Sequence, residues 1–226
     1  MRRFLLSLLI LLFVVGVYNV DGQERKADAF LRNGDLLFQD LDCGPMCDAI
    51  EEVTQGIKGA KFSHVGIVWQ KSDSLFVIEA ISKGVVVTAL NDFLGRSQDS
   101  QGKPKVVVGR LKNKYRNLIN PAIKEALKFL GKPYDDYFQI DNDAYYCSEL
   151  VYFAFLQANG NKPLFPLSPM TYKSPRTGDY YPVWKEYFQK LGVSIPEGKP
   201  GINPGGISRS PMLDIYFSFG KPDGVK

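Results

Sequence analysis

The chain has 226 residues, of which 45% are hydrophobic and 23% are charged, as in an ordinary globular protein. Its net charge of +4 comes without any dense run of lysine and arginine, which argues against a nucleic-acid-binding surface. A chain of this length suits a single domain with a sizeable core.

The first residues have the pattern of a secretory signal. A positively charged start precedes an apolar run from Phe4 to Val17, and small or modest residues follow at Val20–Gly22. The apolar run is short for a membrane span. We therefore expect a signal peptide over residues 1–22 and one domain over residues 23–226, in a periplasmic or extracellular protein. A retained N-terminal anchor is the alternative.

Short strands and one short helix are expected in the first half of the domain. A turn at Asn33–Asp35 precedes a strand at Leu36–Gln39, and apolar spacing then predicts a helix over Asp48–Gly56. Four further strands are predicted, the first three joined by polar links of hairpin size. They are His64–Trp69, Leu75–Ile81, Val85–Leu90 and Val106–Leu111.

Helices dominate the next part of the chain. One begins at Asn120–Pro121, with proline in its first turn, and the most hydrophobic one covers Tyr146–Ala158. From Lys162 onward proline, glycine and aromatic residues are frequent, so we expect a loop-rich flank with a short helix at Pro182–Leu191. Hairpins beside helices predict an α+β fold built around an antiparallel sheet.

The chain has three cysteines, an odd number. Cys43 and Cys47 are the close pair, and they either form a disulfide that closes a very small loop or pack at a helix start. Two thiols and one distant histidine supply too few ligands for a metal ion, so no metal site is expected. Cys147 is left over, either as a reactive thiol or as an inert buried one.

Cys147 stands at the start of the hydrophobic helix. Several apolar residues share its face of that helix: Leu150, Val151, Ala154, Phe155 and Ala158. This face must pack on the sheet, so Cys147 points inward from the first turn. The helix amino terminus favours a thiolate there, and its free N–H groups can stabilise an oxyanion. A core cysteine without chemistry fits the helix pattern equally well.

His64 is the only histidine, and it begins a predicted strand. If Gln70–Asp73 forms a four-residue hairpin loop, Trp69 pairs with Ser74. His64 then lies directly opposite Glu79, with Cβ atoms roughly 5 Å apart. A carboxylate at that distance holds one ring nitrogen and leaves the other as a base. Glu79 also interrupts an apolar strand, where an unpaired charge is costly, although a slip of one residue would separate the two side chains.

Four segments in this order resemble the circularly permuted papain-like branch of the NlpC/P60 superfamily of cell-wall hydrolases. Within that branch, the chain is most similar to the bacterial YiiX-type proteins. The matching segments are Asn33–Phe38, Phe62–Val68, Val77–Ala80 and Tyr146–Val151. In this branch the histidine strand precedes the cysteine helix, which reverses the order found in papain.

The resemblance implies a permuted papain-like fold with the nucleophile at the amino terminus of a helix. It implies that Cys147 is the nucleophile, His64 the base and Glu79 the orienting acid of a cofactor-free hydrolase. It also implies an open groove at the helix start, with Tyr145 and Tyr146 among the positions that line it. Ordinary aromatic packing is the alternative for these two tyrosines.

We therefore expect an exported cysteine amidase or peptidase that cleaves an amide bond in a cell-wall peptide or an acyl amide. A lipid acyl hydrolase or acyltransferase is the second hypothesis, because aromatic residues of the tail could line a groove for an acyl chain. Those residues are Phe165, Tyr172, Tyr180, Tyr181 and Trp184. A binding module without turnover is the third. The expected partner is a small peptide, amide or lipid-like molecule, with possible association with the cell envelope.

Overall fold

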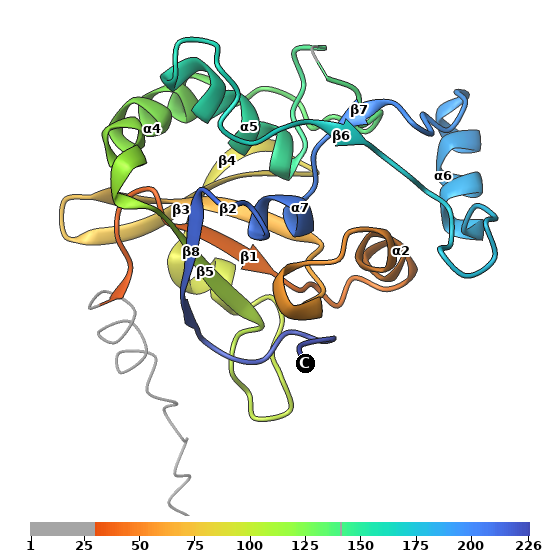
Figure 1. Ribbon diagram of the computed structural model, residues 1–226, viewed down its shortest axis with the longest axis horizontal. Coiled ribbons are helices and arrows are strands. Elements are labelled where there is room, and N and C mark those ends of the chain that lie inside the picture. The colour runs from red at the N-terminus through yellow and green to blue at the C-terminus, as the bar shows by residue number, and fades with distance from the viewer. Residues whose placement is uncertain (1–29, 141) are drawn as a thin grey trace, which may run out of the picture.

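The computed structural model describes residues 30–140 and 142–226 (Figure 1). The expected signal peptide lies outside these described residues. Among the helices that the structure describes, none combines the length and the apolar character that crossing a bilayer requires.

A six-stranded sheet forms the centre of the described chain, and every neighbouring pair of its strands is antiparallel. The strand order is β4-β3-β2-β1-β5-β8. The strands are β1 (Leu36–Gln39), β2 (His64–Lys71), β3 (Ser74–Ile81), β4 (Gly84–Ala89), β5 (Val106–Leu111) and β8 (Leu213–Ser218). Two short strands, β6 (Ser168–Pro169) and β7 (Pro200–Gly201), pair with each other outside this sheet.

In the view of Figure 1, helices lie above the sheet and to one side of it. The helices are α2 (Pro45–Val53), α3 (Leu90–Leu94), α4 (Ile119–Lys128), α5 (Cys147–Ala158), α6 (Pro182–Leu191) and α7 (Pro204–Ser208), with 3₁₀ turns at Ile57–Gly59 and Asn113–Leu118. Helix α5 packs against α4 and against β2 and β3, whereas α6 packs beside α2. The α+β fold around an antiparallel sheet is thus confirmed.

Strand β1 runs through the middle of the sheet and is buried on both faces. Leu36 and Phe38 belong to the larger core, which contains the inner faces of α4 and α5. Leu37 points to the other face and packs with Phe93 of α3. The helix face predicted for Cys147 is the packed one, since Leu150 has no exposed surface.

The tail departs from the expected loop-rich flank. Helix α6 forms where it was predicted, but Leu213–Ser218 forms β8, the strand at one edge of the sheet. Tyr216 is exposed at this edge, so β8 carries little of the apolar alternation that identifies a half-buried strand. Leu90, expected to end a strand, instead begins the short helix α3.

The predicted register of the β2–β3 hairpin is wrong by two residues. Lys71 pairs with Ser74, so the connecting loop has two residues, of which Ser72 has a positive φ of 54°. Continuing this register places Glu79 beside Gly66 and diagonal to His64. Because the side-chain period of a strand is two residues, a shift of two keeps both side chains on one face.

Candidate active site

His64 and Glu79 form a buried hydrogen-bonded pair. The Nε2–H of His64 donates to Oε2 of Glu79 at 2.6 Å, and the exposed fractions of the two residues are 5% and 0%. Gly66 follows His64 by two residues in β2 and lies beside Glu79 of β3. A Cβ atom at Gly66 would stand 3.4 Å from Cβ of Glu79. The diagonal pair therefore meets across a position that has no side chain.

Glu79 is held from its other side by Arg96 and Thr88. The two terminal nitrogens of Arg96 donate to the two carboxylate oxygens at 2.7 and 2.5 Å, and the hydroxyl of Thr88 donates to Oε1 at 2.5 Å. Burial alone would raise the pKa of Glu79. The hydrogen bonds from His64, Arg96 and Thr88 outweigh burial and lower the pKa to about 2, so the carboxylate is ionised at neutral pH.

Cys147 completes this group of side chains. It is the first residue of α5, is 6% exposed, and is the free cysteine of the described chain. Burial would lower the pKa of His64, but hydrogen bonds with Cys147 and Glu79 raise it to about 9. Since Nε2 of His64 is engaged by Glu79, the other ring nitrogen is left for the sulfur. The arrangement therefore favours the imidazolium form of His64.

The start of α5 offers backbone donors beside the sulfur. The first hydrogen bond of the helix runs from the N–H of Leu150 to the carbonyl of Tyr146 at 3.0 Å. The N–H groups of Cys147 and Ser148 therefore lie in the first turn, where a helix provides no backbone acceptor. Donors in this position can stabilise an oxyanion that forms next to Cys147.

A cavity of about 80 Å³ adjoins Cys147. Its walls come from α2, the start of α5, α6 and the segments that connect the later elements. Apolar and aromatic side chains predominate among the lining residues, which include Ile50, Val53, Tyr134, Phe138, Tyr146, Met170, Tyr172, Trp184 and Ile202.

The aromatic residues singled out from the sequence separate into two groups. Tyr146 lines the cavity and accepts a hydrogen bond from the N–H of Ile202 at 3.1 Å. Tyr145 does not line it, because its ring packs 4.5 Å from Phe129 between α4 and α5. The prediction that Tyr145 borders the groove therefore does not hold for this cavity.

Of the tail aromatics, Tyr172 and Trp184 line the cavity. Phe165 instead packs 5.6 Å from Phe155 in the larger core. Tyr180 and Tyr181 are partly buried beside the aromatic cluster of α6. Of the five tail aromatics that could have lined a groove for an acyl chain, two therefore contribute to the wall of this cavity.

Arg96, Thr88 and Tyr134 are site residues that the sequence did not reveal. The polar stretch from Arg96 to Pro104 has the composition of a surface loop, yet the side chain of Arg96 is only 25% exposed and reaches back to Glu79 over a separation of 17 residues. Neither a motif nor a periodicity marks such a contact. An isolated buried acid in a strand does indicate that a positively charged partner is needed. His64 was the only such partner of Glu79 that the sequence suggested.

Cys43 and Cys47 are joined by a disulfide, with Cα atoms 5.4 Å apart. Of the two readings of this pair, the bonded one is correct. The disulfide spans the start of α2, and Ile50 and Val53 of that helix line the cavity. It therefore fixes one wall of the site at the end where the helix begins.

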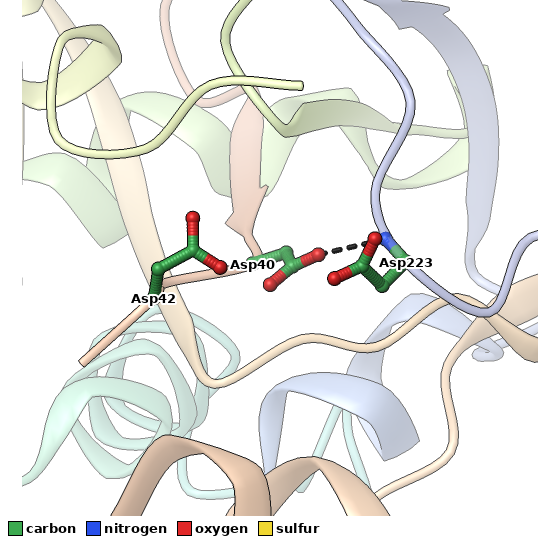
Figure 2. Close-up of side chains that lie close together, drawn as sticks. All are labelled: Asp40, Asp42 and Asp223. Carbon is green, nitrogen blue, oxygen red and sulfur yellow. Dashed lines mark hydrogen bonds between the residues drawn. The ribbon is translucent and has the colours of Figure 1, made fainter. Parts of the chain in front are cut away.

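Three carboxylates lie close together where the residues after β1 meet the last residues of the chain. Asp40, Asp42 and Asp223 place oxygen atoms within 4.8 Å of one another, and the N–H of Asp223 donates to Asp40 at 2.7 Å (Figure 2). The ammonium of Lys105 lies 3.2, 2.6 and 3.5 Å from these three residues in that order. Burial would lower the pKa of Lys105, but the carboxylates raise it. An ammonium already supplies the positive charge, so the cluster does not fit a metal ion.

Lys105→Met should lower the free energy of unfolding by about 3 kcal/mol, because it leaves the buried carboxylate of Asp40 without its cation. Methionine keeps the apolar stem and removes only the charge. Urea unfolding of both proteins measures the difference. Lys103→Met, two residues away and exposed, is the control and should change stability by less than about 0.5 kcal/mol. Equal losses in the two variants would contradict this role of Lys105.

Comparison with known proteins links the chain to one family. A family model described as permuted papain-like amidase enzyme, YaeF/YiiX, C92 family, matches residues 30–216. The uncharacterized protein YiiX of Escherichia coli K12 is 24% identical over 184 residues, which cover 80% of this chain and 84% of that protein. The crystal structure of the metalloprotein YiiX of Escherichia coli O157:H7 matches with a TM-score of 0.67 and 24% identity, over 84% of this chain and 98% of that one.

Proposed function

Because the chain belongs to the YaeF/YiiX family of permuted papain-like amidases, which are cysteine hydrolases, we propose that Cys147, His64 and Glu79 form its catalytic triad. The observation that carries this proposal is the buried imidazole of His64, which is hydrogen-bonded to Glu79 at 2.6 Å and whose pKa is raised by its interactions with Cys147 and Glu79. Arg96 and Thr88 act as positioning residues, since they contact Glu79 and fix its carboxylate.

In the first half-reaction, the thiolate of Cys147 attacks the carbonyl carbon of an amide, and a C–S bond forms. The N–H groups of Cys147 and Ser148 stabilise the oxyanion. The imidazolium of His64 then gives its proton to the amide nitrogen, the C–N bond breaks, and the amine leaves. In the second half-reaction, neutral His64 takes a proton from water, which attacks the thioester. The C–S bond breaks, and the carboxylic acid departs with the thiolate and imidazolium restored.

Glu79 orients His64 and stabilises its charged form throughout. Its own pKa of about 2 means that it stays ionised and is not a proton carrier near neutral pH. This division of roles is the one that a cysteine–histidine–acid site requires. The two hydrogen bonds from Arg96 keep the carboxylate from rotating away from the imidazole.

We also propose that the protein is exported. The charged and apolar pattern of its first residues supports this, and so does the disulfide between Cys43 and Cys47, because disulfides persist in oxidising compartments. An exported amidase would meet peptides and acyl amides of the cell envelope.

The solved E. coli relative is described as a metalloprotein. In this chain Lys105 occupies the centre of the Asp40, Asp42 and Asp223 cluster, so that cluster is not proposed as a metal site. No step of the proposed reaction is assigned to a metal ion. The chemistry proposed for the triad depends on proton positions at Cys147 and His64 alone.

Iodoacetamide labelling at a series of pH values tests the activated thiol. Without a reductant, Cys43 and Cys47 are bonded, so mass spectrometry of the product reports the reaction at Cys147. We expect fast labelling well below pH 8, because the imidazolium of His64 stabilises the thiolate. In His64→Ala the rate should follow that of an ordinary thiol with a pKa of about 8.5. An ordinary profile in the wild type would refute the proposed nucleophile.

A further inference from the structure

Gln39, the last residue of β1, is buried directly opposite His64 of β2. The two residues are partners in the β1–β2 ladder, so their side chains lie on the same face of the sheet. The side chain of Gln39 has no exposed surface, and it does not line the cavity beside Cys147. Any influence of Gln39 on the site must therefore act through other groups of the protein.

The amide of Gln39 holds the main chain at the end of α3. Its Nε2–H donates to the carbonyl oxygen of Phe93 at 2.8 Å, over a separation of 54 residues. The last carbonyls of a helix have no donor within the helix, so a side chain of another element can supply one. Because a carbonyl can only accept, the nitrogen of the amide must face Phe93.

The residue after Gln39 is bonded to the other end of the same segment. The hydroxyl of Ser97 donates to the carbonyl oxygen of Asp40 at 2.5 Å, and both residues are buried. Side-chain hydrogen bonds thus connect the end of β1 to residues 93 and 97. The main chain that carries Arg96 is therefore held on both sides.

Phe93 and Arg96 are the residues of this segment that reach the proposed triad. The ring centroid of Phe93 lies 5.8 Å from that of the His64 imidazole and 5.2 Å from Cζ of Arg96. The guanidinium donates at 2.7 Å to Oε2 of Glu79, the same oxygen to which His64 donates. A shift of the segment would move both the ring beside the imidazole and the cation that fixes its carboxylate.

The oxygen of the Gln39 amide has no partner. Oε1 is buried, and no described residue donates a hydrogen bond to it. A buried acceptor without a donor is unfavourable, whereas an apolar side chain of the same length would leave no oxygen unpaired. The bond to Phe93 and the unpaired oxygen have opposite effects on stability, so the fold alone gives little reason for an amide at this position.

We infer that Gln39 is a positioning residue of the proposed triad, which fixes Phe93 and Arg96 and through them the orientation of His64 and Glu79. This inference rests on the proposed function, and it adds a residue that lies outside the cavity beside Cys147. It gives the end of β1 a role in keeping the imidazole and the carboxylate aligned.

Gln39→Met tests this role, because methionine has nearly the same length and removes both the amide donor and the unpaired oxygen. For an aminocoumarin amide that the wild type hydrolyses, kcat should fall at least about tenfold, since a misplacement of about 1 Å can cost a factor of about 10². KM and the melting temperature should change little, because Gln39 does not line the cavity and its two effects on stability oppose each other. Gln157→Met, at an exposed position of α5, is the matched control and should alter none of these values.

The titration of His64 gives a second readout that needs no turnover. His64 is the only histidine of the chain, so one imidazole NMR signal reports its pKa. Cys147 and Glu79 raise this pKa, Arg96 is bonded to Glu79, and Gln39→Met removes none of the three. In that variant the pKa should fall from about 9 toward its ordinary value of about 6.5, because a less well oriented carboxylate stabilises the imidazolium less.

Either an unchanged kcat or an unchanged pKa of His64 in a folded Gln39→Met protein would overturn the inference, and where no amide is hydrolysed the pKa alone decides. Failure of the proposed function would appear instead in the wild type, as ordinary reactivity of Cys147 toward iodoacetamide. If Gln39→Met does not fold, Ser97→Ala decides in its place, because it removes the other bond of the segment at the loss of one hydroxyl. A lower kcat and a lower pKa in Ser97→Ala support the inference, and a wild-type value of either one overturns it.

Discussion

Cys147→Ala is expected to lower amide hydrolysis by about 10⁵-fold or more, because covalent catalysis is lost together with its nucleophile. The fold should be retained, since alanine is tolerated at a helix start and Cys147 makes no disulfide. The measurement is kcat/KM for the fastest amide found, together with the melting temperature of each variant.

His64→Ala is measured alongside Cys147→Ala, both alone and combined with it. Because the two residues act as one unit, the double variant should be no slower than either single variant. Wild-type activity should also fall above about pH 9, where the imidazolium of His64 loses its proton and can no longer protonate the leaving nitrogen. Full activity in Cys147→Ala would mean that the hydrolytic site lies elsewhere.

Glu79→Gln is expected to lower kcat about 10³- to 10⁴-fold, the loss seen when an orienting carboxylate becomes an amide. The glutamine keeps the size of the side chain but leaves Arg96 without an anionic partner. Removal of the negative charge also lowers the pKa of His64, so the alkaline fall in activity should move below pH 9. The pH profile of kcat measures both effects.

Glu186→Gln on the exposed surface of α6 is the matched control for this substitution and should leave the profile unchanged. A loss of activity in Glu79→Gln with the alkaline limb still near pH 9 would assign Glu79 to folding alone. Loss with a shifted limb identifies it as the group that positions and charges His64.

The site could be anticipated from the sequence to the extent that local periodicity determines it. The position of Cys147 followed from the apolar face of one helix, and that face is buried as predicted. The pairing of His64 with Glu79 survived a register error of two residues, because a shift of two preserves the face of a strand. A shift of one would have separated the two side chains.

Contacts between distant segments were the part that periodicity could not supply. Arg96 reaches Glu79 from a loop whose polar composition indicated only exposure. The edge strand β8 carries mostly exposed residues, so its sequence looks like that of a loop until β5 provides a partner. In each case the decisive partner is remote in the chain. Membership of the YiiX-type permuted papain-like family, by contrast, was predicted from short local motifs and is confirmed by the family match.

Lys105 gives the described chain a counter-ion that cannot diffuse away. In many proteins a group of converging carboxylates depends on calcium or magnesium, so chelators and depleted media weaken it. Here the positive charge is the ammonium of Lys105, the residue directly before β5, and it lies 3.2 Å from Asp40 and 3.5 Å from Asp223. Because this ammonium is covalently part of the chain, it stays between the two carboxylates. The attachment of the last residues to the sheet is therefore independent of the supply of divalent cations, and EDTA should leave it intact.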